Sequence, residues 1–245
     1  MHKETYESHD PHFLEAPSVT TNKGQTEDDG GKSLNSWKSL LINWPLMSSI
    51  IIYCVFSLHD MAYTEIFSLW AVSPGSFGGL SFSTQDVGAV LSVTGLGLFI
   101  YQLSIYHYVE RWLGAVTVCR VAAALSILTL ACYPSIASLH GTILTLALNA
   151  ASIIKNIMSA SIITGCFILQ NRAVEQHQRG AANGIAMTSM SIFKAIGPAG
   201  GGAIFSMGQK RVHAAFLPGN QLVFFVLNMV ELIGLVLTFK PFLAY

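Results

Sequence analysis

Residues 141–169 read GTILTLALNAASIIKNIMSASIITGCFIL, an apolar stretch that contains a single charged residue, Lys155. An α-helix needs about 20 predominantly apolar residues to cross the hydrocarbon core of a bilayer. This stretch is longer than that and carries almost no charge. Its length therefore predicts a helix that spans a membrane.

The composition of the whole chain supports this interpretation. Hydrophobic residues make up 52% of the 245 residues, and only 11% are charged. A soluble domain carries about 25% charged residues, because its surface must face water. The formal net charge is zero, which gives no indication of a nucleic-acid partner. We expect much of the surface to face a lipid bilayer.

Five further apolar stretches are long enough to span a bilayer, and turn-forming sequences such as SPGSFGGLS and FLPGN separate them. We therefore expect an all-α membrane protein with six transmembrane helices in the region 40–245. Residues 1–39 are polar and are predicted to form a disordered cytoplasmic tail. The six predicted spans are 44–71, 86–106, 113–133, 141–169, 181–207 and 220–239.

The distribution of Lys and Arg predicts the orientation. Cytoplasmic loops carry an excess of basic residues. If residues 1–39 are cytoplasmic, the opposite side of the membrane holds only Lys210 and Arg211, so we expect both ends of the chain in the cytoplasm. The basic residues then on the cytoplasmic side are Lys3, Lys23, Lys32, Lys38, Arg111, Arg172, Arg179 and Lys240.

Ionisable residues within the predicted spans are candidates for function, because a charge in hydrocarbon needs a partner or water. The first span carries Asp60 and Glu65, and we expect one of them to carry a coupling proton. The alternative is that this end of the long span emerges into the headgroups and leaves both acids hydrated. Lys194 lies about halfway along the fifth span. Arg120 is close enough to the cytoplasmic interface to reach it and is not assigned to the site.

The fourth span carries a polar stripe. Asn149, Ser152, Asn156 and Ser159 follow one another at steps of three, four and three residues, and Lys155 borders them. Hydrogen bonds between helices would explain the Asn and Ser residues. They do not explain a lysine at mid-span, so we expect a polar pathway for substrate or protons.

The fifth span contains a cluster of helix-breaking and small residues. Residues 197–202 read GPAGGG, and small residues allow another helix to approach closely. We expect Gly197, Pro198, Gly201 and Gly202 to form a pivot between helices. A static packing face with a harmless kink is the alternative.

No enzyme motif is present. The sequence lacks GxSxG, HExxH and the phosphate-binding GxxxxGK[ST] pattern. We therefore predict no catalytic residues, no metal site and no cofactor.

The glycine cluster also carries a family resemblance. GPxxGG resembles the motif on the fifth helix of major facilitator superfamily antiporters, although Phe193 stands where that motif has a further glycine. Residues 40–245 resemble the C-terminal six-helix half of the plant zinc-induced-facilitator-like proteins. The strings that carry this second resemblance are NWPLMSSIIIYCVFSLHDMAYTEIFSLWAVSP, GGLSFSTQDVG, FILQNRAVEQHQRGAANGIAMTSMSIFKAIGPAGGG and FLPGNQLVFFVLN.

The resemblance implies a function as well as a fold. It implies proton-coupled transport of metal chelators, such as nicotianamine or phytosiderophores, or of small ions in zinc and iron homeostasis. The membrane would be that of the vacuole or the plasma membrane. Two six-helix halves face each other in such carriers, so the chain would work with an N-terminal half or a second copy. The alternative is a truncated membrane protein that binds or regulates a full-length carrier without transporting.

Overall fold

The computed structural model describes residues 38–211, 214, 216 and 218–243. The chain divides into two units, residues 1–36 and residues 37–245. The expected disordered tail therefore lies outside the described residues, apart from its last two positions. The described part of the second unit is built from helices and contains no strand.

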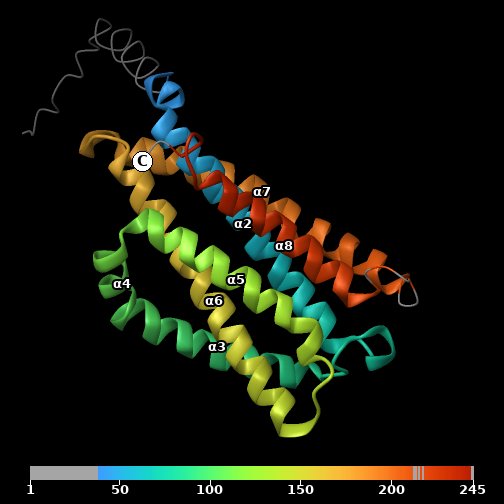
Figure 1. The fold of residues 1–245 in the computed structure, drawn as a ribbon. Coiled ribbons are helices and arrows are strands. Elements are labelled where there is room, and N and C mark those ends of the chain that lie inside the picture. Colours follow the sequence, from blue (N-terminus) through green and yellow to red (C-terminus); the bar gives the residue numbers. More distant parts are fainter. Residues whose placement is uncertain (1–37, 212–213, 215, 217, 244–245) are drawn as a thin grey trace, which may run out of the picture. The chain divides into compact units, whose positions relative to one another are not determined.

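Six long helices occupy the six ranges predicted to span the membrane (Figure 1). A short helix, α4 (Tyr106–Leu113), joins α3 to α5, and two single-turn 3₁₀ segments, η1 (Gly75–Phe77) and η2 (Gln176–Gln178), lie in loops. The long helices are α2 (Trp44–Val72), α3 (Thr84–Ser104), α5 (Ala115–Ile136), α6 (Gly141–Arg172), α7 (Arg179–Gln209) and α8 (Asn220–Leu237).

Local sequence sets where several of these helices begin. Asn43 caps α2, its side chain accepting a hydrogen bond from the backbone N–H of Leu46, and Pro45 follows within the first turn, where a missing N–H costs nothing. Ser83 and Asp86 form a reciprocal capping box at the start of α3. Gly114 separates α4 from α5 with a φ of 76°, which glycine adopts at no steric cost.

Four of the six long helices meet the standard of a membrane span in both length and hydropathy: α2, α3, α5 and α6. The 18-residue α8 counts as a shorter apolar helix, and α7 is not among the four. The many glycines of α7 and its Lys194 dilute its apolar character. The structure thus shows an all-α membrane protein with four clear spans, and six spans remain a prediction.

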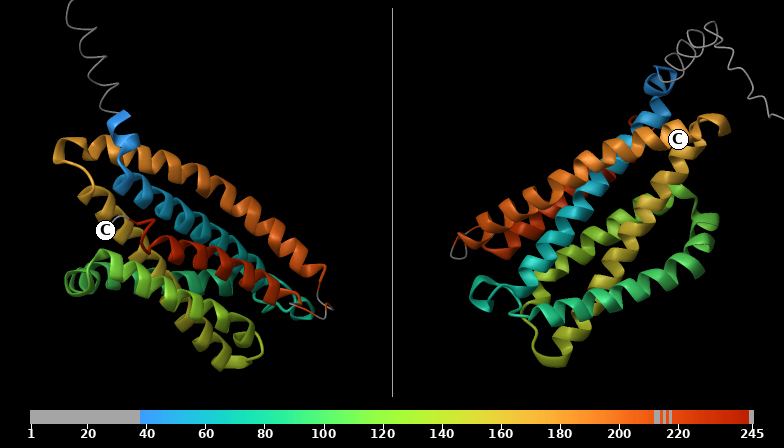
Figure 2. Two further views of the ribbon diagram at one scale, coloured as in Figure 1. Left: turned by 45° about the horizontal axis from the view of Figure 1, so that its top comes forward. Right: turned by 180° about the vertical axis from the view of Figure 1, so that it is seen from behind.

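The helices pack in two groups that share extensive contacts. α2 packs along α7 and also touches α8, whereas α6 packs along α5 and α3. Contacts of α5 with α8 and of α2 with α6 join the two groups. The further views in Figure 2 show α2 lying beside α7, and α6 beside α5. A side chain that α2 directs between α6 and α8 therefore points into the bundle.

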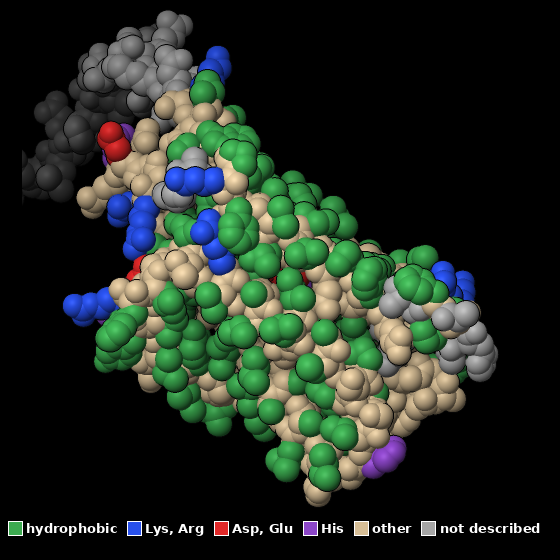
Figure 3. All heavy atoms as spheres, in the orientation of Figure 1, with side chains coloured by type: hydrophobic (Ala, Val, Ile, Leu, Met, Phe, Trp, Pro, Cys, Tyr) green, Lys and Arg blue, Asp and Glu red, His purple; other side chains and the backbone are tan. Residues whose placement is uncertain are grey.

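The surface of the bundle is strongly apolar. Green side chains cover the helical body in Figure 3, while Lys and Arg gather at its ends. On α3, the side chains of Leu96, Phe99 and Leu103 are 61–68% exposed. A soluble protein rarely exposes apolar patches of this extent, but lipid tails solvate them at no cost.

The interior is also apolar at both ends of the bundle. An aromatic cluster centred on Phe67, Trp70, Tyr133 and Phe224 fills the end of the bundle where α2 ends and α8 begins, and the Trp70 and Phe224 rings lie 5.2 Å apart. A second cluster, which includes Tyr53, fills the other end between α2, α5 and α6. The polar groups described next lie between these two clusters along α2.

Candidate functional site

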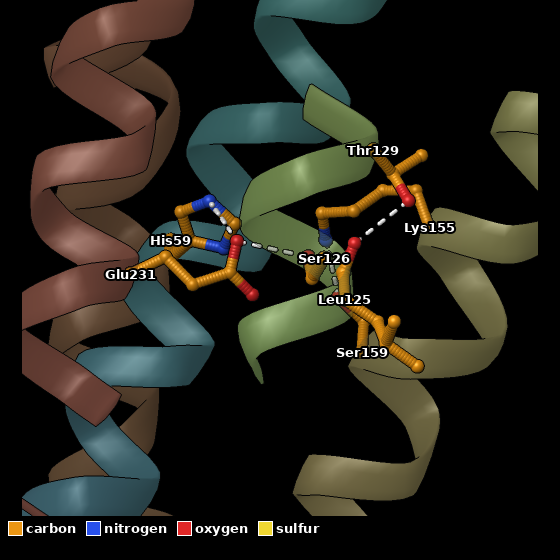
Figure 4. A network of polar contacts seen from close by, with 7 residues as sticks. All are labelled: His59, Leu125, Ser126, Thr129, Lys155, Ser159 and Glu231. Carbon is orange, nitrogen blue, oxygen red and sulfur yellow. Dashed lines mark hydrogen bonds and ion pairs between the residues drawn. The ribbon is translucent and has the colours of Figure 1, made fainter. Parts of the chain in front are cut away.

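A histidine and a glutamate meet inside the bundle. His59 of α2 and Glu231 of α8 are 1% and 0% exposed, and Nε2 of the histidine lies 3.4 Å from Oε2 of the glutamate. Figure 4 shows the two side chains pointing toward each other from neighbouring helices. A fully buried carboxylate is costly unless it is paired, so this contact satisfies part of its electrostatic requirement.

Ser126 of α5 completes this contact. Its hydroxyl donates a 2.8 Å hydrogen bond to Oε2 of Glu231, the same oxygen that faces His59. The other carboxylate oxygen, Oε1, is buried and has no hydrogen-bond partner among the described residues. The carboxylate is therefore held by one oxygen and retains unused capacity to accept a hydrogen bond or a proton.

A buried lysine lies close to this pair. Lys155 of α6 is fully buried, its Nζ donates a 2.5 Å hydrogen bond to Ser159, and it lies 4.5 Å from the centre of the Tyr63 ring. The ammonium charge acts electrostatically on both His59 and Glu231. We call His59, Ser126, Lys155, Ser159 and Glu231 the polar network; Figure 4 shows its members converging from four helices.

Hydroxyl pairs extend the polar interior beyond the network. The Tyr63 and Tyr133 hydroxyls lie 2.8 Å apart and join α2 to α5. Thr94 of α3 donates a 2.8 Å hydrogen bond to Ser152 of α6. These bonds cross between helices, which is how polar side chains hold helices together in a membrane.

The amides of the predicted stripe on α6 behave differently from its hydroxyls. Nδ2 of Asn149 donates to the carbonyl of Thr145, and Nδ2 of Asn156 donates to that of Ser152, each four residues back on the same helix. These two bonds stay within α6, but the Asn156 side chain also interacts with the Tyr63 hydroxyl of α2. Oδ1 of Asn149 is buried without a hydrogen-bond partner among the described residues.

Asn149 lines a cavity of about 900 Å³ between the beginnings of α3 and α6. Asp86 contributes to the same cavity from α3. Lys155 does not line it, and its side chain is closed off from solvent within the bundle. The structure thus separates two residues that the sequence places on one stripe: Asn149 borders open space, whereas Lys155 is enclosed.

The three other charged candidates lie outside the polar network. Asp60, Glu65 and Lys194 are half-buried, and their side chains form no hydrogen bond or ion pair with the described residues. The Asp60 carboxylate nevertheless acts electrostatically on Glu231. The structure brings Lys155 and Asp60 into one electrostatic neighbourhood and leaves Glu65 and Lys194 without a charged partner in the part of the chain it describes.

The glycine cluster of α7 lies against α2 at two positions. A Cβ atom added at Gly197 would lie 2.8 Å from Cβ of Met61, and one added at Gly201 would lie 3.1 Å from the carbonyl oxygen of Ala62. Gly202 differs from the expectation, because an added Cβ there would meet nothing within 4 Å. Gly202 points away from α2, since one further residue turns the side chain by 100° around the helix.

Pro198 lies between the two contact glycines. α7 continues without interruption from Arg179 to Gln209, so the proline does not divide it. Proline lacks the backbone N–H that would reach the carbonyl of Lys194 four residues earlier.

The acid at the centre of the network, Glu231, is not among the residues predicted from the sequence. Glu231 is the only charged residue in the apolar stretch 220–239, and that isolation is the signal that identifies it. His59 is adjacent to Asp60 in the first span, but nothing in that span indicates that the histidine faces the last one. Ser126 is one of many serines and carries no signal of its own.

Comparison with known proteins shows the relationship of the chain. It is 63% identical over 210 residues to the zinc induced facilitator-like 1 protein of Arabidopsis thaliana. This match covers 86% of the chain and 44% of that relative. It is 56% identical over 245 residues to the zinc induced facilitator 1 protein of the same plant, covering 99% of the chain and 50% of the relative.

The chain belongs to the plant zinc-induced-facilitator-like family of the major facilitator superfamily. A further relative in Arabidopsis thaliana, 58% identical over 212 residues, is named as a probable peptide/nitrate transporter. The match covers 84% of the chain and 44% of that relative. The chain spans about half the length of the curated relatives it matches. No family model and no solved structure matches the chain.

The relatives in the zinc-induced-facilitator-like family bear the names of facilitators and transporters, and none is named as an enzyme. Among the described residues, no three His, Cys, Asp or Glu side chains gather in a way that would hold a metal ion.

Proposed function

We propose that the chain forms the C-terminal six-helix half of a proton-coupled carrier of the zinc-induced-facilitator-like family. The carried solutes would be metal chelators of the nicotianamine or phytosiderophore type, or small ions, in zinc and iron homeostasis. The observation that carries the proposal is the 56–63% identity to two named zinc induced facilitators.

The polar network supports transport rather than a purely structural role. A buried ion pair contributes little to stability, because desolvation offsets most of the attraction between its charges. Ionisable groups inside a membrane bundle are typical of proton and substrate pathways. We therefore include Lys155, Asp60, Glu65, Asn149, Asn156 and Lys194 in a pathway that Glu231 and His59 extend toward α8.

A partner is part of the proposal. Carriers of the major facilitator superfamily surround a midplane site with two six-helix halves. An N-terminal six-helix half, or a second copy of this chain, would supply the missing wall. α3, the least enclosed of the four clear spans, offers such a partner an apolar surface. The bilayer around the pair would be the vacuolar or plasma membrane, with both ends of the chain in the cytoplasm.

Uptake by proteoliposomes tests the proposal. One preparation holds this chain alone, a second holds it together with the N-terminal half of the Arabidopsis facilitator-like relative, and a third holds that N-terminal half alone. We expect only the second to accumulate zinc–nicotianamine or a small cation such as K⁺ under an imposed pH gradient. Collapsing the gradient with a protonophore should abolish the accumulation.

A non-transporting regulator is the second candidate, because the chain covers only half of its relatives. In that case the second preparation stays inactive although both proteins are inserted, and this chain changes the uptake rate of a full-length relative when the two are reconstituted together. That combination of results would overturn the carrier proposal.

A further inference from the structure

We propose that Glu231 and His59 form a proton-binding site that holds one exchangeable proton, with Lys155 as its fixed counter-charge. The role of this site in transport rests on the proposed function, whereas proton binding itself is a property of this chain. Asp60 and Glu65, the acids that the first span offers, would then not hold the proton.

The geometry around Glu231 suits a proton shared between two groups. Oε2 lies 3.4 Å from Nε2 of His59 and accepts the Ser126 hydroxyl, while Oε1 is buried without a partner among the described residues. Nε2 of His59 forms no hydrogen bond with the described residues, so the 3.4 Å contact is electrostatic. When the proton is on His59, the imidazolium faces the carboxylate across this contact, and when it is on Glu231, the carboxyl group faces the neutral imidazole. Either arrangement keeps the proton within one contact.

The surrounding charges limit the site to one proton. Among the fully buried groups, the ammonium of Lys155 balances the carboxylate of Glu231 while the imidazole is neutral. A proton added to the pair leaves one excess positive charge, which the half-buried carboxylate of Asp60 offsets from within electrostatic range. A second added proton would find no compensating charge among the groups that face the pair.

Every helix packed against Glu231 contributes to this balance. α2 contributes His59 and Asp60, α5 contributes the Ser126 hydroxyl, and α6 contributes Lys155. α7 also touches α8, and the ionisable residue in its middle, Lys194, is half-buried. Tyr63 and Tyr133 lie on the Lys155 side and bond to each other.

Burial links proton exchange to movement. Neither His59 nor Glu231 reaches solvent in this arrangement, since their side chains are 1% and 0% exposed. A proton therefore enters or leaves only when α2, α5 and α8 separate enough to admit water. Such coupling between access and protonation is what a proton-driven carrier requires, because it prevents the proton from leaking through the bundle.

Infrared difference spectroscopy on the full chain in liposomes tests proton binding without any transport assay. The carbonyl band of a protonated carboxylic acid is followed as the pH is stepped. We expect a titrating band that disappears in Glu231→Gln and shifts in frequency in Glu231→Asp. Glu65→Gln and Asp60→Asn test the two alternative acids, and each should still show a titrating band. The exposed Glu175→Gln is the matched control, and circular dichroism verifies that each variant is folded.

Two charge variants should shift the titration in opposite directions, and a third variant tests the imidazole. Lys155→Met removes a positive charge and should move the midpoint of the titration to higher pH by about one unit. Asp60→Asn removes a negative charge and should move it to lower pH. His59→Gln should shift the midpoint without removing the band. Both charge variants moving the midpoint in the same direction would contradict the proposed balance.

The possible results separate this inference from the proposed function. A band that persists in Glu231→Gln, or that is absent from the unaltered chain at every pH, overturns the proton site whatever the transport assay shows. A band that behaves as expected in a chain that never supports uptake upholds the site and overturns the carrier role.

Discussion

Gly201 of α7 lies directly against the backbone of α2, where an added Cβ would come within 3.1 Å of the carbonyl oxygen of Ala62. Gly197, one turn earlier, is closer still to Met61. These two positions allow α2 and α7 to form the most extensive helix pair of the bundle. The position of α2 matters because it carries His59 into the polar network.

The tight contact predicts opposite effects of alanine at two glycines of α7. Alanine favours helix over glycine by about 1 kcal/mol, so Gly202→Ala, which meets no atom within 4 Å, should be neutral or stabilising. Gly197→Ala forces its Cβ against Met61 and should destabilise by about 1–3 kcal/mol despite the same helix preference. Reversible unfolding in mixed micelles compares the two variants, and equal stabilities would show that the contact is not tight.

Leucine at the same face should also impair transport. We expect Gly201→Leu in a full-length carrier to lower uptake more than Ala203→Leu, because Ala203 is exposed and its side chain faces away from α2. Insertion into the membrane is checked for both by surface labelling. Equal uptake by the two variants would remove the basis for a pivot at this contact.

Removing only one charge of the Glu231–Lys155 pair should lower the free energy of unfolding more than removing both charges. Glu231→Leu leaves Lys155 without its fully buried counter-charge and should lower the free energy of unfolding by about 3–5 kcal/mol. The double variant Glu231→Leu/Lys155→Met removes both charges and should recover most of this loss. A double-mutant cycle measured by unfolding gives the coupling between the two residues. Additive effects of the two single variants would mean that they do not interact.

The buried tyrosine pair offers a similar test without charge. Tyr63→Phe leaves the buried hydroxyl of Tyr133 without that hydrogen bond and should destabilise by about 1–3 kcal/mol. The double variant Tyr63→Phe/Tyr133→Phe removes both hydroxyls and should lie close to the original stability. Thermal unfolding followed by circular dichroism ranks the variants. A double variant that is less stable than either single one would contradict the pairing.

The exposed ion pair between Glu110 and Arg172 should contribute little in comparison. Its N–O distance is 2.8 Å, but the Arg172 side chain is 56% exposed. Such pairs contribute about 0–1 kcal/mol and weaken with salt. We therefore expect Arg172→Gln to change the free energy of unfolding by less than about 1 kcal/mol, and less again in high salt. A loss comparable to that of Glu231→Leu would indicate a further role for this pair.

Sequence patterns were sufficient to locate the long helices. They were not sufficient to predict which helices contact one another. Long apolar stretches and turn-forming loops located all six long helices to within a few residues, because the length of a span follows from bilayer thickness and backbone hydrogen bonding alone. The same reasoning predicted a polar pathway at Lys155, since a charged lysine at mid-span is costly in lipid. The structure encloses Lys155 in the bundle, and the pathway stays a prediction. It did not predict α4, which fills the gap between the second and third predicted spans.

Which residues of those helices contact each other could be learned only from the tertiary structure. Nothing in the stretches 44–71 and 220–239 shows that His59 faces Glu231, because the two residues are 172 positions apart and meet only when α2 packs beside α8. Likewise, GPAGGG predicts a close helix contact but not which glycines make it. Gly197 and Gly201 face α2 whereas Gly202 does not, because the rotation of α7 about its axis is set by packing across the whole bundle. Sequence by itself determined where the long apolar helices lie, and the packing of the helices decided which of their charges meet.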